Sequence, residues 1–425
     1  MFNHSNSDRL QFSLTIYLIG RRGKTMNIKH KIVPIIAIIL ASFNLRPVIT
    51  SVSPLLGTIR QTLHMSAATA SLLTSLAVLC MGLFAPFAIK LANRWRIERT
   101  IAYALILIGL ATATRYFANT AWVMLVTALL SGIGIAIVGP LLSGYIKEKF
   151  ANPSRVVGIY SLALVVGAAL GSGLSIPLSN FFHSWQASSA SWAILALIAL
   201  FFWWKPIEQK AVTASVTNSP SKSNSVKQML MNQKAWLLTG FFGLMAFMFY
   251  TIMAWLPPIA ENLGYSKHDA GMMLTLLTIA QMPATFLVPI LNNRFQHRAV
   301  WLVGSSSLEL IGLLMLLFSY NPWLSSILIG LGAGGLFSLG LTLPIDEAKD
   351  IHEASFLAAM TQSVGFVFAA LGPFFVGLVR DFTGNFTTAI IGMIIIVLVM
   401  ILIQLKIGNQ KQPQMHHIHI KKTTF

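Results

Sequence analysis

The chain has 425 residues, of which 55% are hydrophobic and only 10% are charged. Soluble domains carry about 25% charged residues, so this composition excludes a soluble enzyme and predicts a protein that faces lipid. The single cysteine excludes a disulfide framework and a cluster of thiol metal ligands. The formal net charge of +18 would suit a nucleic-acid-binding protein, but the distribution of the charge argues against that class.

Apolar stretches long enough to cross a membrane recur along the whole chain. A helix needs about 20 apolar residues to span a hydrocarbon core about 30 Å thick. In the first half the predicted spans are 32–52, 67–89, 100–117, 121–145, 156–182 and 185–204. In the second half they are 235–258, 270–291, 299–318, 322–344, 354–379 and 386–405. We therefore predict an all-α membrane protein with twelve transmembrane helices.

The basic residues predict how these helices are oriented. If both termini are cytoplasmic, the 30 Lys and Arg residues fall in cytoplasmic segments with five exceptions, Arg46, Arg60, Arg115, Lys267 and Arg380. This asymmetry is the positive-inside rule of membrane proteins. The charge therefore encodes orientation, and no nucleic-acid partner is expected.

The two halves of the chain repeat each other at an offset of about 200 residues. Four pairs of segments match in order. These pairs are 66–73 with 266–273, 91–95 with 291–295, 132–134 with 332–334, and 169–171 with 370–372. We predict two six-helix bundles, 32–204 and 235–405, which are joined by a polar cytoplasmic linker, 205–234. The cytoplasmic tails are 1–31 and 406–425.

This organisation resembles the major facilitator superfamily. Segments 91–95 and 291–295 are similar to degraded copies of its Gly-x-x-x-Asp-Arg-x-Gly-Arg loop motif, with Asn93 and Asn293 in the place of the acid. In the family that acid helps to lock one conformational state. The resemblance therefore implies that gating here depends on Arg94 and Arg294 with other partners.

Within the superfamily, the chain resembles the cyanate and 2-nitroimidazole transporter group. The similar segments are Leu45-Arg46-Pro47, 54–60, 160–162, 255–257 and 362–365. The resemblance implies alternating-access transport of a small anionic or weakly acidic solute, coupled to protons, by a monomer in the bacterial cytoplasmic (inner) membrane.

Arg46 is the most informative residue, because it lies about 14 residues into the first span, or roughly 21 Å along a helix. A guanidinium at that depth must face a wet cavity or a partner. Its planar fork suits a small oxyanion, and it keeps its proton. We predict that Arg46 binds substrate, and a structural ion pair or carbonyl contact is the alternative. Pro47 and Pro54 should disturb the helix around it.

Other substrate-binding candidates lie on helices that line or flank the central cavity of the resembled fold. Asn44 could hydrogen-bond a solute, and Tyr250 and Trp255 could stack on it. For the two aromatic residues the alternatives are packing and, for Trp255, the membrane interface. Tyr160 and Gln362 come from helices that match each other across the repeat, and contacts between helices are the alternative role for Gln362.

Three acidic residues are candidates for coupling or gating. Glu309 is the one acid placed deep inside a predicted span, which makes it the candidate proton carrier. Its helix is peripheral in the resembled fold, so a packed, protonated carboxyl is the alternative. Asp346 and Glu347 end the tenth span, and we expect them to pair with cytoplasmic arginines at a gate.

Two other classes of membrane protein remain as alternatives. One is a multidrug efflux transporter for lipophilic compounds, which usually needs an acid in the cavity. The other is a membrane-embedded solute sensor. Enzymatic activity is not expected, since no cluster of acids, His or Cys is present at one depth, and no P-loop or zinc-protease motif occurs. No cofactor and no metal site are predicted.

Overall fold

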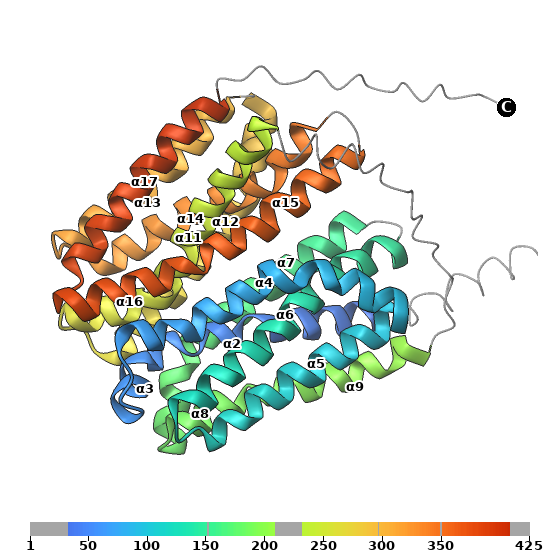
Figure 1. Ribbon diagram of the computed structural model, residues 1–425, viewed down its shortest axis with the longest axis horizontal. Coiled ribbons are helices and arrows are strands. Elements are labelled where there is room, and N and C mark those ends of the chain that lie inside the picture. The colour runs from blue at the N-terminus through green and yellow to red at the C-terminus, as the bar shows by residue number, and fades with distance from the viewer. Residues whose placement is uncertain (1–32, 151–152, 209–231, 296, 349–350, 409–425) are drawn as a thin grey trace, which may run out of the picture.

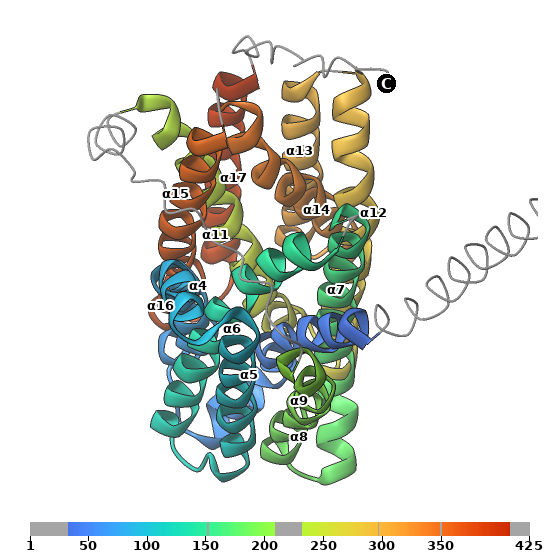
Figure 2. The same ribbon diagram turned by 90° about the vertical axis from the view of Figure 1, so that its right-hand side faces the viewer.

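The computed structural model describes residues 33–150, 153–208, 232–295, 297–348 and 351–408. The predicted N-terminal tail (1–31), most of the predicted C-terminal tail (406–425) and most of the linker lie outside these residues. Twelve of the described helices are long and apolar enough to cross a membrane. Both views of the ribbon separate them into two bundles, one from each half of the chain (Figures 1 and 2). The predicted fold class is confirmed.

The first half begins with helical residues 33–45, followed by three short segments, α2 (Pro47–Thr50), the 3₁₀ turn η1 (Ser53–Leu55) and α3 (Leu56–Thr62). The helices that follow are α4 (Ala67–Trp95), α5 (Ile97–Ala113), the 3₁₀ turn η2 (Thr114–Phe117), α6 (Ala121–Lys149), α7 (Pro153–Phe182), α8 (Trp185–Ser191) and α9 (Ala193–Glu208).

The second half repeats this order with α11 (Gln233–Asn262), α12 (Lys267–Phe295), α13 (Arg298–Leu317), α14 (Pro322–Asp346), α15 (Ile351–Ala369), α16 (Leu371–Thr383) and α17 (Thr387–Gly408). Helices α15 and α16 together form one span. The predicted spans correspond to these helices in order. The main difference is the first span, which continues to Thr62 rather than ending at Val52.

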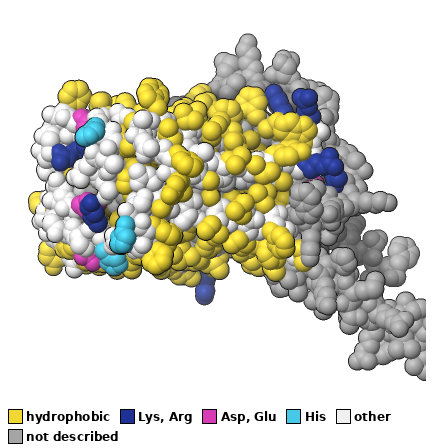
Figure 3. Space-filling view, turned by 90° about the horizontal axis from the view of Figure 1, so that it is seen from below, with side chains coloured by type: hydrophobic (Ala, Val, Ile, Leu, Met, Phe, Trp, Pro, Cys, Tyr) yellow, Lys and Arg dark blue, Asp and Glu magenta, His cyan; other side chains and the backbone are white. Residues whose placement is uncertain are grey.

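The helix ends lie at two faces of the molecule. The face at which α9 ends and α11 begins is called the linker face. The opposite face, at which the turns 63–66, 263–266 and 384–386 lie, is called the far face. On the face seen in Figure 3 the middle is rich in hydrophobic side chains, whereas most Lys and Arg side chains lie near the two ends and the histidines near one of them. This distribution fits a molecule with lipid around its middle.

Exposed aromatic residues mark the far side of this apolar band. Phe117, Trp122, Phe181, Phe318 and Phe382 are each more than two-thirds exposed, although their rings are large and apolar. Aromatic side chains favour the boundary between lipid and water. Their positions at the helix ends nearest the far face therefore agree with a membrane-spanning bundle.

The internal repeat is visible in the close contacts that glycines allow between α4 and α6 and between α12 and α14. A Cβ on Gly132 in α6 would lie 2.6 Å from the Cα of Ala77 in α4. In the second half it is Gly330 in α14 that makes the matching contact, since its Cβ would lie 2.3 Å from the carbonyl oxygen of Leu277 in α12. Gly132 thus corresponds in its contacts to Gly330, two residues before the Gly332 that sequence matching pairs with it.

Candidate functional site

The first span breaks where the sequence predicts that it should. The backbone turns at Arg46, and α2 begins with Pro47 at its first position. The carbonyl of Arg46 accepts hydrogen bonds from the amides of Ile49 and Thr50, each 3.0 Å long. A second irregular stretch follows at η1, which contains Pro54. The two prolines remove amide donors, so the helix interior cannot continue regularly.

Arg46 is half-buried, in the middle of the first span. Among the residues that the structure describes, none forms a hydrogen bond or an ion pair with its guanidinium. Its nearest characterised neighbour is the ring of Phe249 in α11, whose centroid is 5.8 Å from Cζ. A charged group at this depth costs about 3 kcal/mol or more. Within the described part of the chain, the side chain is therefore a cation without a counter-charge, placed where the first bundle faces Phe249 of the second.

Tyr160 in α7 is the second polar group at this place. Its hydroxyl interacts with Ser143 of α6 and lies within electrostatic range of Arg46. Arg46, Tyr160 and Ser143 come from three different helices of the first half, and Phe249 faces them from the second. The structure thus brings Arg46 and Tyr160 together, as a shared site requires.

Tyr250 follows Phe249 in α11 and is almost fully buried. Its hydroxyl lies 3.6 Å from the sulfur of Met81 in α4, across the boundary between the bundles. Its ring centroid lies 5.1 Å from that of Phe249 and 6.2 Å from that of Phe366. Tyr250 therefore belongs to an aromatic wall next to Arg46, with its polar end at the boundary between the bundles.

Two candidate amide side chains have polar atoms without a hydrogen-bond partner among the described residues. Asn44 is buried, and its amide nitrogen has no hydrogen-bond partner among the described residues. Gln362 in α15 is half-buried, and no described residue hydrogen-bonds its side chain. A buried amide without partners loses its hydrogen bonds to water. Among the described residues, the amide nitrogen of Asn44 and the side chain of Gln362 thus have unused hydrogen-bonding capacity.

Trp255 lies in a different setting from the other candidates. Its indole is fully buried, and the indole N–H donates to the carbonyl oxygen of Pro373 in α16 at 2.9 Å. Its ring lies 5.6 Å from that of Phe386. The single donor of the indole is already used, and the ring packs inside the second bundle. This contact ties α11 to α16.

Arg115 is buried, although the sequence predicts that it lies in an outer segment. It lies in η2 and is 2% exposed. Its Nη1 donates to the carbonyl oxygen of Val48 at 2.9 Å. That carbonyl is left over by the irregular first span, because the amide of Val52 bonds to Ile49 instead. Arg115 thus fixes the segment that follows Arg46.

Glu309 lies in α13 and is 1% exposed. Its Oε2 has no partner among the described residues. A Cβ on Gly332 of α14 would lie 3.1 Å from the Cβ of Glu309, so the two helices are in close contact there. The carboxyl is therefore packed between α13 and α14.

Asp346 and Glu347 pair with cations of their own bundle. Arg298 at the start of α13 contacts both carboxylates, and its Nη2 is 3.6 Å from Asp346. Glu347 also pairs with Lys234 at the start of α11. Burial raises the pKa of Asp346 above its ordinary value, although Arg298 opposes this. Burial also acts to raise the pKa of Glu347, but Lys234 and Arg298 outweigh it and hold that pKa below its ordinary value.

The two predicted gating arginines make no such pairs with the described residues. Arg94 lies over the ring of Trp95, 6.0 Å from its centroid, and Arg294 lies over Phe295 at 5.7 Å. They occupy matching places at the linker-face ends of α4 and α12. The acids thus bind Arg298 and Lys234, whereas Arg94 and Arg294 stack on the residues that follow them.

A family model described as Major Facilitator Superfamily matches residues 36–370 and 242–417. An uncharacterized transporter of Bacillus subtilis (strain 168), YycB, is 36% identical over 371 residues, which cover 86% of this chain and 91% of that protein. The 2-nitroimidazole transporter of Escherichia coli (strain K12) is 32% identical over 388 residues, with coverage of 90% and 97%. The cyanate transport protein CynX of the same organism is 31% identical over 379 residues, with coverage of 86% and 96%.

A bacterial homolog to the human lysosomal transporter Spinster, solved in an inward-facing and occupied conformation, has a similar structure. The TM-score is 0.70 at 16% sequence identity, and the match covers 89% of this chain and 96% of that one. Identity this low shows a shared fold and nothing about the solute.

Proposed function

The chain belongs to the Major Facilitator Superfamily of membrane transporters, and on that premise we propose that it moves a small anionic or weakly acidic solute by alternating access of its two bundles. The observation that carries the proposal is Arg46, a half-buried cation in the middle of a span that no described residue neutralises. An anion that enters the site removes the cost of this unpaired charge. Two relatives are named as a 2-nitroimidazole transporter and a cyanate transport protein, which agrees with a small solute of this kind.

In the proposed site Arg46 holds the negative charge of the solute with two parallel N–H groups. The hydroxyl of Tyr160, within electrostatic range of Arg46, supplies a further donor. Phe249 and Tyr250 offer ring faces and edges to a flat solute. Asn44 and Gln362 complete the hydrogen bonding. Trp255 contributes by holding α11 against α16 rather than by direct contact, because its donor is used.

The linker face is proposed to be cytoplasmic, because the basic residues near it exceed those near the far face. In the described structure, each ion pair near the linker face whose two partners are both described joins residues of one bundle. At the far face Arg60 of the first bundle pairs with Asp381 of the second. We therefore assign this structure to a state that is closed at the far face and open toward the cytoplasm.

Uptake into proteoliposomes tests the proposal. Labelled cyanate, 2-nitroimidazole and a lipophilic cation would be compared for wild type, Arg46→Lys, Arg46→Gln and the exposed control Arg99→Gln. We expect wild type and Arg99→Gln to transport one of the two small solutes, Arg46→Gln to lose at least tenfold, and Arg46→Lys to be intermediate because it lacks the planar fork. Transport of only the cation, with no effect of Arg46→Gln, would favour the multidrug alternative.

A further inference from the structure

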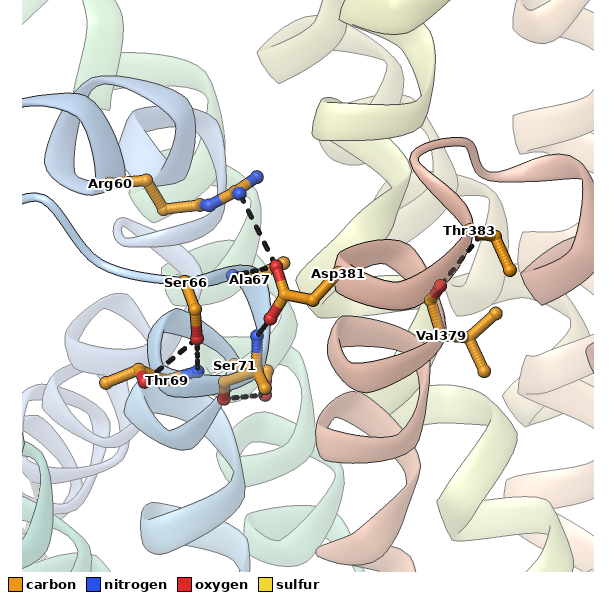
Figure 4. Close-up of polar contacts among 9 residues, drawn as sticks. Arg60, Ser66, Ala67, Thr69, Ser71, Val379, Asp381 and Thr383 are labelled. Carbon is orange, nitrogen blue, oxygen red and sulfur yellow. Dashed lines mark hydrogen bonds and ion pairs between the residues drawn. The ribbon is translucent and has the colours of Figure 1, made fainter.

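The start of α4 is capped by a residue of the other bundle. Asp381, in the last turn of α16, accepts hydrogen bonds from the backbone amides of Ala67 and Ala68, with both distances 2.7 Å. One carboxylate oxygen receives each amide, and Figure 4 shows the carboxylate placed at the end of the helix. A negative charge at this position also favours the helix dipole. The bond spans two helices that belong to different bundles.

The repeat shows that this cap is unusual. Helix α12 corresponds to α4, and it is capped within its own bundle, because Ser266 donates to Asp269 at 2.7 Å and the amide of Asp269 donates back to Ser266 at 3.1 Å. In α4 the residue that matches Asp269 is Thr69, and the first turn holds no acid. Helix α4 keeps the corresponding serine cap, because the amide of Thr69 donates to Ser66 at 3.0 Å, and it receives in addition a carboxylate from the second bundle at its first two amides.

Gly377 lies one helical turn before Asp381 and brings the two backbones together. A Cβ on Gly377 would lie 2.6 Å from the carbonyl oxygen of Ala67 and 2.9 Å from the Cα of Ala68. Such separations are too short for any other side chain. Residues i and i+4 share one face of a helix, so the glycine and the carboxylate form one surface that fits the start of α4.

Arg60 adds a weaker contact from the first bundle. Its Nη2 lies 4.0 Å from Oδ1 of Asp381, and both side chains are 29% exposed. The guanidinium and the two amides reach the same carboxylate from α3 and α4 (Figure 4). An exposed ion pair at this distance contributes little by itself, so the amide contacts carry most of the interaction.

A further contact region between the bundles, where α7 meets α12, uses neutral groups. There the hydroxyls of Ser172 and Thr275 lie 2.8 Å apart. Elsewhere near the far face, Ser53 donates to the carbonyl of Met253 and Lys267 donates to Thr58. Asp381 differs from these contacts because its carboxylate accepts hydrogen bonds from backbone amides at a helix start. It does so across the boundary between the bundles, where α16 meets α4.

We propose that Asp381, with Gly377 beneath it, is a latch that holds the far face closed. The inference rests on alternating access in the proposed function. When the bundles rock apart at the far face, α16 leaves α4, and the two amides lose the carboxylate. The latch stabilises only the closed state, and a contact made in one state alone shifts the balance toward that state. Its strength therefore sets how often the far face opens without solute.

Distances between spin labels test the latch directly. With the buried Cys80 changed to Ala, one pair of labels would sit at exposed positions of the far face, Gln61 and Thr388. A second pair would sit at exposed positions of the linker face, Arg99 and His297. Each pair joins the two bundles. Pulsed electron resonance would give the distance distributions in lipid nanodiscs without any solute.

We expect Asp381→Asn to raise the population with a long far-face distance by about fivefold, the factor expected for the loss of a helix cap. The linker-face distance should shorten in the same population. The matched control, Asp269→Asn, removes an acid from the corresponding helix start but not from the boundary, so it should leave both distributions unchanged. Gly377→Ala should act in the same direction as Asp381→Asn.

Two results would overturn the latch. One is that Asp381→Asn leaves both distance distributions as in wild type, whatever the effect of Gly377→Ala. The other is a longer far-face distance with no change at the linker face, which means local loosening rather than rocking. Because no solute is present, failure here leaves the anion site untouched. A failed anion site with intact rocking would likewise leave the latch in place.

Discussion

Arg46 and Arg115 show how the surroundings of one residue type decide its role. Both guanidiniums lie within or near the apolar part of the first bundle, but Arg115 has a carbonyl partner in Val48 and Arg46 has none among the described residues. The depth of Arg46 in its span was enough to single it out as the substrate-binding candidate. Arg115 could not be found in this way, because it lies at the end of a span, and its partner is a carbonyl freed by irregular backbone 67 residues away.

Replacing Arg115 should destabilise the protein and disturb the site at the same time. Arg115→Leu leaves the carbonyl of Val48 unpaired, which costs about 1–3 kcal/mol. We expect a lower midpoint of thermal unfolding in detergent, together with weaker solute binding by the protein that stays folded. Arg99→Leu, at an exposed position, is the control. Unchanged stability of Arg115→Leu would show that water or another donor replaces the guanidinium.

The surroundings of each side chain also separate the other substrate-binding candidates from one another. Tyr160 lies within electrostatic range of Arg46, and the hydroxyl of Tyr250 lies at the boundary between the bundles, as helix position alone suggested. Trp255 also lies on α11, but its indole points to Pro373. The direction of a side chain around its helix depends on the packing of neighbours, and the repeat pattern did not contain that information.

At the scale of elements, the first span shows what proline spacing can and cannot predict. Pro47 and Pro54 predicted an irregular helix, and α2 and η1 confirm it. The end of the span at Thr62 was not predicted, because the predicted span stopped at Val52, before Pro54. In the structure Ser53 donates to Met253 of the second bundle, so a tertiary contact supports continuation of the chain there.

The network at the linker face of α11, α13 and α14 predicts a pH dependence. Because the pKa of Glu347 is held below its ordinary value, its carboxylate stabilises the fold at pH values above that ordinary pKa. This contribution is lost as the pH falls through the lowered pKa. Asp346, whose pKa is raised, acts in the opposite sense. The two effects can be separated with Glu347→Gln.

We expect Glu347→Gln to lower the midpoint of thermal unfolding at neutral pH, where the variant leaves Arg298 and Lys234 with one fewer carboxylate. The difference from wild type should begin to shrink below about pH 4.5, the ordinary pKa of Glu, and should disappear as the pH falls through the lowered pKa, where wild-type Glu347 becomes neutral in the folded protein as well. The midpoints of both proteins would be recorded from pH 3.5 to 7.5. A difference that stays constant over this range would contradict the assigned network.

At the scale of the whole molecule, composition, span lengths and the repeat were enough to predict the fold, and the resemblance carried by segments such as 91–95 and 291–295 was enough to predict the family. They could not predict the state of the transporter, because both states bury the same helices and differ only in which ends of the bundles touch. The latch at Asp381 joins residues 314 positions apart. Its one sequence signal is Thr69 in the place that corresponds to Asp269, a missing acid at a helix start.

Proton coupling is a property of the whole transport cycle, and Glu309 allows it to be tested. The carboxyl is packed between α13 and α14, so we expect uptake to follow an imposed pH gradient in wild type and in Glu309→Gln alike. The measurement is solute uptake into proteoliposomes with an acidic or an equal outer pH. Loss of gradient dependence in a folded Glu309→Gln protein would identify this residue as the proton carrier and refute the packing role.

The central claim is that Arg46 binds an anion, and the thermal stability of the purified protein tests it most directly. A solute that binds only the folded state stabilises it by about 2.7 kcal/mol at a hundredfold excess over Kd. Wild type, Arg46→Gln and Arg99→Gln would be compared with small anions, weak acids and lipophilic cations. We predict that a small anion or weak acid raises the unfolding midpoint of wild type and Arg99→Gln but not of folded Arg46→Gln. Equal stabilisation of all three proteins, or stabilisation by lipophilic cations alone, would contradict the account.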